Sequence, residues 1–204
     1  MPRKILTNPR KLPRQDRSKV TVEAILTATT HILTEEGYDK ANTNRIAEVA
    51  GVSVGSLYQY FPNKESLIAV LAEHHAEEMV QLVESHLKNL SNAPIQEVLH
   101  ELVKAVILAH AINPALHKVL NEQVPRSDLM RQSAEAKMAA ILRSYLEKRC
   151  DQLQSQNLNL VVFIVGRTVE ALTHAAVIEH PELLSSGQLE REITKLVSSY
   201  LVKP

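Results

Sequence analysis

The chain has 204 residues, of which 45% are hydrophobic and 3% aromatic, and its formal net charge at pH 7 is zero. This length can bury one large core or two small ones, and abundant Ala, Leu, Val, Ile, Glu and Gln favour helices throughout. The single cysteine, Cys150, is expected to be a small apolar filler, and it excludes an intrachain disulfide and a cysteine-rich metal site.

The N-terminal end of the chain is basic. Residues 1–64 hold ten Lys and Arg against six Asp and Glu, whereas residues 65–204 hold thirteen against seventeen. Within residues 1–18, six basic side chains accompany only Asp16, and three prolines prevent a regular helix. We therefore expect residues 1–18 to form a flexible basic arm, which either contacts phosphates or the minor groove of DNA or is a solvated tail.

The first helix is expected from about Lys19 to Glu36, because its apolar residues recur on one face and Gly37 closes it. Two short helices and a tight turn follow in residues 42–61. Thr43 and Ser53 are candidate N-caps of the two helices, and Gly51 can adopt the left-handed conformation that ends the first of them. Short helices joined by a glycine corner form a helix-turn-helix.

The second short helix buries Leu57 and Phe61, which lie four residues apart on one face. Small and hydrogen-bonding groups off that buried face suit entry into the major groove of DNA. The candidate DNA contacts are Ser53, Val54, Gly55, Ser56, Tyr58, Gln59 and Tyr60, with Arg45 and Lys64 as basic neighbours. The alternative is a structural hairpin in an all-helical interaction or adaptor protein.

Helices are expected to fill the rest of the chain. Their approximate ranges are 64–90, 95–112, a short helix around 116–120, a helix that ends near 148, 157–180 and 186–201. Residues 160–165 alone could form a buried strand, but they have no partner strand, so helix is preferred. No run approaches the roughly 18–20 apolar residues of a membrane span and no signal region is present, so we expect a soluble, cytoplasmic protein.

Catalytic and metal-binding patterns are weak. The sequence contains no phosphate loop, nucleophile elbow or Cys/His metal spacing, and no pair of carboxylates in an apolar setting. His110, His117 and His174 come from three expected helices and could meet in a pocket, but each could equally be an ordinary histidine. We expect no enzyme, no cofactor and no metal site.

The stretch from about Val22 to Leu71 resembles the N-terminal domain of the TetR (tetracycline-repressor) family. The residues that carry the resemblance are Gly37-Tyr38, Thr43, Ile46-Ala47, Ala50-Gly51-Val52-Ser53, Gly55, Leu57-Tyr58, Tyr60-Phe61 and Asn63-Lys64-Glu65-Ser66-Leu67. Val54 departs from the pattern, since relatives often carry a polar or charged residue there, although a valine can touch a thymine methyl group.

The resemblance implies an all-α homodimer of about nine helices. It further implies that Thr43 and Lys64 grip phosphates and that Tyr58 helps to fix the DNA backbone. The expected organisation is a basic arm (1–18), a helix-turn-helix DNA-binding domain (19–64) and an effector-binding and dimerisation domain (65–204). In such proteins the last two helices pair with those of a partner subunit, and the central helices enclose a small, often apolar, effector.

The resemblance also places the two C-terminal sites. Dimer contacts are expected on residues 157–180 and 186–201, from Ala171, Leu172, Ala175, Ala176, Ile193, Val197 and Tyr200. The first of these helices is apolar all round between 160 and 165, which requires cover on every side. Effector contacts are expected from Val103, Ile107, Leu120, Leu142, Tyr145 and Phe163, with His110, Arg167 and His174 as polar anchors, although each apolar residue could belong to ordinary core. Together these features predict a repressor that a small molecule releases from a palindromic DNA operator.

Overall fold

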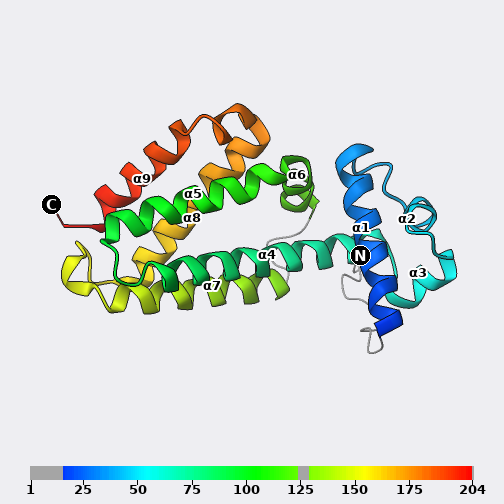
Figure 1. Cartoon of the computed structure of the whole chain (residues 1–204), viewed down its shortest axis with the longest axis horizontal. Coiled ribbons are helices and arrows are strands. Elements are labelled where there is room, and N and C mark those ends of the chain that lie inside the picture. The colour runs from blue at the N-terminus through cyan, green and yellow to red at the C-terminus, as the bar shows by residue number, and fades with distance from the viewer. Residues whose placement is uncertain (1–15, 124–128, 204) are drawn as a thin grey trace, which may run out of the picture. The chain divides into compact units, whose positions relative to one another are not determined.

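The computed structural model describes residues 16–123 and 129–203. Within these ranges the chain forms nine α-helices and no strand (Figure 1), which confirms the all-α fold class. The helices are α1 (Asp16–Glu35), α2 (Thr43–Val49), α3 (Val54–Tyr60), α4 (Lys64–Asn89), α5 (Ile95–Ile112), α6 (Pro114–Gln123), α7 (Leu129–Glu147), α8 (Leu158–Glu179) and α9 (Gln188–Leu201). Two short 3₁₀ helices, η1 (Cys150–Gln152) and η2 (Pro181–Leu184), flank α8.

The described residues form two compact units. The N-terminal unit contains residues 16–75 and 119–123, and the C-terminal unit contains residues 76–118 and 129–203. The division falls within α4, after His75, rather than at the domain boundary predicted after residue 64. Helix α1 begins at Asp16, so the last three residues of the predicted arm are helical, and residues 1–15 lie outside the described residues.

A small apolar core holds the helix-turn-helix against α1. Helix α2 packs on both α1 and α3, and the side chains of Ile25, Ile32, Ile46 and Leu57 are completely buried between them. Ser53 caps α3 as predicted, because its Oγ accepts a hydrogen bond from the Ser56 amide at 3.0 Å. The cap of α2 was predicted wrongly: Asn42, not Thr43, accepts from the Arg45 amide. The side chain of Thr43 is therefore available for another contact.

Replacing Gly51 with alanine is expected to lower the free energy of unfolding by about 1–2 kcal/mol. Gly51 lies in the turn between α2 and α3 with φ +67°, and a Cβ atom added there meets nothing within 4 Å, so the whole cost is conformational. The control is Gly55→Ala inside α3, where φ is helical and alanine is the better helix former. Chemical denaturation of both variants checks the prediction, and equal losses of stability would contradict it.

The core of the C-terminal unit lies between α5, α8 and α9, with the end of α4 and part of α7. Helix α5 packs against both α8 and α9, and α7 packs against α8. Val98, Leu153 and Ile193 are among its least exposed side chains. The end of the chain is tied to this core, since the Gln154 amide donates to the Leu201 carbonyl at 3.0 Å. Cys150 is exposed in η1, so its expected role as an apolar filler is wrong.

Helix α8 is long and apolar enough, by length and composition, to cross a membrane. This contradicts the expectation that no segment approaches a membrane span, which counted unbroken apolar runs and overlooked a helix with few charged residues. Core helices of soluble proteins pass the same test but are mostly buried, whereas 28% of the apolar window of α8 is buried within the chain. Helix α8 packs against α5, α7 and α9, and its Arg167 and Glu170 form an ion pair.

Candidate DNA-binding surface and effector residues

Helix α3 presents an exposed face opposite its buried residues. Val54 and Tyr58 are 37% and 39% exposed, and they lie four residues apart on one row of the helix. Gly55 and Gln59 form a second exposed row beside it. The Cβ of an alanine at position 55 would meet only the Ser53 hydroxyl, at 3.8 Å, so the backbone there is open to close approach. These four residues combine an apolar side chain, a glycine and two hydrogen-bonding side chains, and none of them is acidic.

Two contacts hold predicted phosphate-binding groups in place. The Thr43 hydroxyl at the start of α2 lies 3.0 Å from the Tyr58 hydroxyl, so the α2 N-terminus and the exposed row of α3 are linked. At the start of α4, the Lys64 ammonium donates to the Tyr38 carbonyl at 3.2 Å and lies 3.6 Å from the centroid of the Tyr38 ring. Tyr38 thus positions the charge of Lys64. The sequence pattern did not predict this role for Tyr38, although Tyr38 is part of the family motif.

Arg45, the other predicted basic contact, is held by two carboxylates. Its guanidinium lies 2.8 Å from Glu36 and 3.1 Å from Glu48. The hydrogen bond from Arg45 lowers the pKa of Glu36, so this pair is charged at neutral pH. A phosphate could bind Arg45 only by displacing these carboxylates or by sharing the guanidinium with them. A DNA contact from Arg45 therefore stays a prediction.

Tyr60 was expected on the outward face of α3, and this expectation is wrong. Its side chain is only 9% exposed, and the neighbouring Leu57 and Phe61 are also buried. The cause is geometric, since residues 57, 60 and 61 are spaced by three and four and share one side of a helix. Tyr60 therefore supports α3 rather than presenting its ring to solvent.

The predicted effector residues divide into three groups. Val103, Ile107 and Tyr145 are buried in one hydrophobic cluster of the C-terminal unit, and Leu142 packs against it. Leu120 is buried and belongs to the N-terminal unit. The expectation that Phe163 walls a cavity is wrong, because its side chain is 61% exposed on α8.

The polar anchors are partly brought together. The Nε2 atoms of His110 on α5 and His174 on α8 lie 3.1 Å apart. Burial lowers the pKa of His110, and its hydrogen bond to the Val106 carbonyl and the charge of Glu170 act in the opposite direction. Arg167 instead forms ion pairs with Glu135 at 2.5 Å and Glu170 at 2.6 Å.

The predicted dimer residues include both exposed and buried side chains. Leu172 is 39% exposed, Ala171 is exposed, and Ala175 and Tyr200 are half-buried. By contrast, Ala176, Ile193 and Val197 are at most 3% exposed and belong to the core of the chain itself. Large exposed apolar residues that the sequence did not single out for this surface are Leu160 and Leu196.

Comparison with known proteins identifies the family. Residues 25–71 match the bacterial regulatory proteins of the tetR family, and residues 94–201 match the tetracyclin repressor-like C-terminal domain. The nucleoid occlusion factor SlmA of Haemophilus influenzae is 25% identical over 174 residues, which cover 84% of this chain and 74% of that protein.

Two solved structures share the fold. SmeT, the repressor of the Stenotrophomonas maltophilia multidrug efflux pump SmeDEF, superposes with a TM-score of 0.70 at 21% identity, covering 92% of this chain and 93% of SmeT. FadR of Bacillus subtilis in complex with stearoyl-CoA superposes with a TM-score of 0.68 at 21% identity, covering 87% of this chain and 97% of FadR. With both domain matches in the expected order and a helix-turn-helix that exposes α3, the chain belongs to the TetR family of DNA-binding transcriptional regulators.

Proposed function

We propose that this protein is a cytoplasmic transcriptional repressor that binds a palindromic DNA operator as a homodimer and is released by a small-molecule effector. The observation that carries the proposal is the exposed face of α3, which presents Val54, Gly55, Tyr58 and Gln59 without an acidic neighbour on that face. A helix of seven residues is about 10 Å long, which fits across the major groove. Thr43 and Lys64 would bind phosphates beside it.

Exposed apolar side chains on α8 and α9 support the homodimer. Leu160, Phe163 and Leu172 on α8 and Leu196 on α9 are between 39% and 61% exposed within the single chain. Ala171 and Ala175 lie on α8 between larger residues and would allow a second helix to approach closely. A twofold dimer would repeat this surface on both subunits and match the symmetry of a palindrome.

A buried hydroxyl in the C-terminal core supports an effector site. The Tyr145 hydroxyl is inaccessible to solvent and makes no hydrogen bond to any described residue. Leaving such a group unsatisfied costs about 1–3 kcal/mol, which a ligand with an acceptor atom would offset. Burial raises the pKa of Tyr145, so the phenol is a hydrogen-bond donor at neutral pH. Val103 and Ile107, which belong to the same hydrophobic cluster as Tyr145, favour an apolar effector, as does the stearoyl-CoA bound by FadR.

A mobility-shift assay with the DNA upstream of the protein's own gene tests the proposal. We expect a discrete complex with two subunits on one site, and competition by the same palindrome but not by scrambled DNA. Binding that is equal for both DNAs at physiological salt would contradict sequence-specific recognition. A reporter gene placed behind the site should be expressed more strongly when the regulator is deleted.

Effector and operator are expected to lower each other's affinity by the same factor. A ligand that prefers a conformation with a different spacing between the two α3 helices must oppose DNA binding, and this linkage is reciprocal. Half-sites lie one DNA turn, about 34 Å, apart, so a misfit of a few ångströms is enough. Calorimetric titration of a ligand from a thermal-shift screen, with and without operator, measures the factor. Equal affinities in the two titrations would show that the ligand does not regulate DNA binding.

The similarity to SlmA supports a second candidate, a DNA-binding factor in nucleoid occlusion. This function would use the same α3 surface at DNA sites that need not be promoters. Genome-wide mapping of bound DNA distinguishes the candidates, because a repressor concentrates at promoters whose transcripts rise on deletion.

A further inference from the structure

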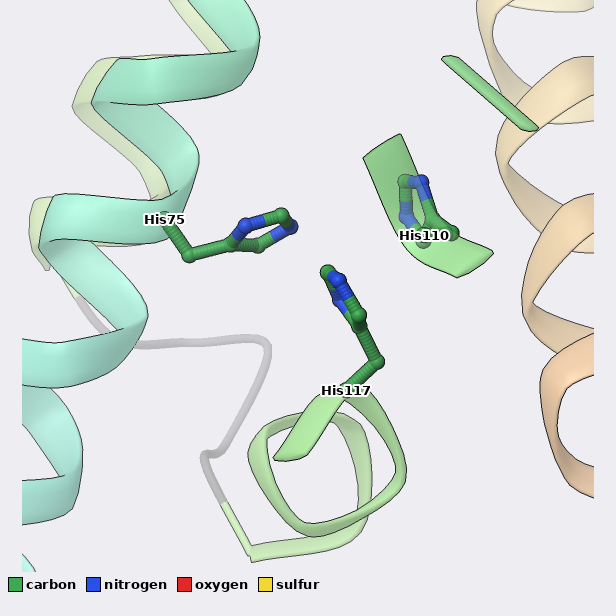
Figure 2. A group of neighbouring side chains, drawn as sticks. All are labelled: His75, His110 and His117. Carbon is green, nitrogen blue, oxygen red and sulfur yellow. The ribbon is translucent and has the colours of Figure 1, made fainter. Parts of the chain in front are cut away.

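The histidines drawn in Figure 2 are part of the packing between helices. The rings of His110 on α5 and His117 on α6 are buried and stacked, with centroids 4.5 Å apart and planes inclined by 23°. The third side chain labelled there, His75, belongs to the N-terminal unit. The lone pair of an imidazole nitrogen lies in the plane of its ring, so two stacked rings do not direct their nitrogens at one common ligand. A more specific arrangement of charged groups lies in the N-terminal unit, where α1 ends and α2 begins.

Arg45 joins the end of α1 to the first turn of α2. Its Nε lies 3.2 Å and 3.4 Å from the two carboxylate oxygens of Glu36, and its Nη2 lies 2.8 Å from one of them. The remaining nitrogen, Nη1, donates to Glu48 at 3.1 Å. Every nitrogen of the guanidinium therefore has a carboxylate partner. The two-point contact with Glu36 is the geometry in which an arginine–carboxylate pair is strongest and most directional.

The two carboxylates differ in what they connect. Glu48 follows Arg45 by three residues on the same helix, so that ion pair lies within α2. Glu36 directly follows α1, so its ion pair closes the connection of residues 37–42 between the two helices. The side chain of Glu36 is 29% exposed, against 71% for Glu48. Glu36 is thus the partner through which Arg45 fixes α2 relative to α1.

The connection closed by this ion pair carries both predicted phosphate-binding groups. Near its start, Tyr38 accepts from the Lys64 ammonium through its carbonyl at 3.2 Å, and the ammonium lies 3.6 Å from the centroid of the Tyr38 ring. Directly after its end, the Thr43 hydroxyl lies 3.0 Å from the Tyr58 hydroxyl on α3. A movement of the start of α2 away from α1 would therefore shift Thr43, and through the connection it would shift the charge of Lys64.

We propose that Arg45 is a positioning residue for DNA binding, which acts through Glu36 by fixing the start of α2, and that Arg45 does not itself bind a phosphate. This inference rests on the proposed binding of an operator through α3. The local charge supports it, because one guanidinium and two carboxylates carry a net charge of −1 and do not attract a phosphate. The sequence pattern predicted a DNA contact from the charge of Arg45 alone, since the two ion pairs depend on the folded structure.

Two variants that each remove one carboxylate distinguish positioning from a phosphate contact. Glu36→Ala and Glu48→Ala take one negative charge from the same guanidinium, so a general gain in attraction to DNA is common to both. If Arg45 bound a phosphate, both variants would release it and raise operator affinity. We expect instead that Glu36→Ala binds operator more weakly than Glu48→Ala, by about two- to fivefold for each subunit and roughly 4- to 25-fold for two subunits, as for loss of a well-formed surface ion pair.

Exchange of the two charges provides a rescue. A protein with Glu36→Arg, Arg45→Glu and Glu48→Ala regains an ion pair between the end of α1 and α2, with reversed polarity and without a second carboxylate beside it. A carboxylate only accepts hydrogen bonds and cannot bind a phosphate. Operator affinity should therefore rise from the level of Glu36→Ala toward that of Glu48→Ala if the role of Arg45 is positioning. Affinity below that of Glu36→Ala would indicate that the cation itself is needed.

Fluorescence anisotropy with full-length protein and labelled operator measures these affinities, and thermal melts show whether each variant is folded. If Glu36→Ala is unfolded at the assay temperature, Glu36→Gln and Glu48→Gln replace the alanine pair, because glutamine keeps the size of the side chain. Arg45→Gln gives an independent readout. Loss of a phosphate contact reduces the slope of log affinity against log salt by about 0.9 for each subunit, whereas loss of a positioning residue leaves the slope unchanged.

Three results would overturn the positioning role. They are equal or higher operator affinity of Glu36→Ala than of Glu48→Ala, no rescue by the exchanged charges, and the reduced salt slope in Arg45→Gln. The unmodified protein is the reference in each comparison. Its failure to bind any operator would contradict the proposed function together with this inference. Native binding that Glu36→Ala leaves unchanged would contradict the positioning role alone.

Discussion

Replacing Leu196 with aspartate is expected to convert the proposed homodimer into a folded monomer. Leu196 is 53% exposed on α9 within the single chain, so the chain itself does not need it for packing. In a dimer formed through α8 and α9 the new carboxylate would be buried without a partner, at a cost of several kcal/mol. Sedimentation at micromolar concentration should show half the native mass, and helical content by circular dichroism should be unchanged.

The adjacent position provides the matched comparison. Val197 is 2% exposed and belongs to the core of the C-terminal unit, so Val197→Asp should lower the free energy of unfolding by several kcal/mol and reduce helical content. The two variants differ by one residue along α9 and place the same charge at an exposed and at a buried position of the same helical turn. If Leu196→Asp stays dimeric, the subunits meet through another surface.

Leu196 and Val197 also show how far a dimer interface can be predicted from sequence alone. The periodicity of α9 identifies Ile193 and Val197 as its apolar stripe, and they do pack, but against their own chain. A stripe that faces the core and a stripe that faces a partner have the same spacing, so the hydrophobic pattern cannot separate them. Leu160 and Leu196 become candidates only when their exposure is known.

Helix boundaries could be predicted because they depend on local chemistry. The ends of α5 follow from Pro94 and the Asn113-Pro114 pair, and the start of α4 follows from Asn63, whose side chain accepts from the Ser66 amide at 2.8 Å. Where two neighbouring residues can each act as a cap, local reasoning fails. Asn42 and Thr43 are such a pair, and the distant hydrogen bond of Thr43 to Tyr58 is consistent with its place inside α2.

Contacts between distant residues could not be predicted in the same way. The sequence suggested that His110, His117 and His174 could meet, but their distances depend on how α5, α6 and α8 pack. The ion pair between Arg45 and Glu36, the cation–aromatic contact between Lys64 and Tyr38 and the burial of Tyr60 likewise follow from packing. Of these, the burial of Tyr60 changes the expected role of a predicted site residue, whereas the contacts of Arg45 and Lys64 fix where their charges lie.

Two substitutions in α3 should separate residues that bind DNA from residues that stabilise the fold. Gln59→Ala is expected to weaken operator binding by about 1–3 kcal/mol, the range for a good base or phosphate contact, without changing the melting temperature. Gln59 is exposed, so its removal leaves no cavity. Tyr60→Ala should instead lower the free energy of unfolding by about 3 kcal/mol or more, because it empties a buried aromatic site.

Fluorescence anisotropy with a labelled operator at fixed salt, together with thermal melts, measures both quantities for each variant. Lys64→Ala is the third variant in this comparison. Removal of a phosphate contact should weaken binding to operator and to scrambled DNA alike. It should also reduce the slope of log affinity against log salt by about 1. A stable Gln59→Ala protein with native operator affinity would mean that this row of α3 does not contact DNA. Recognition would then have to come from the row of Val54 and Tyr58, whose position is fixed through the hydrogen bond to Thr43.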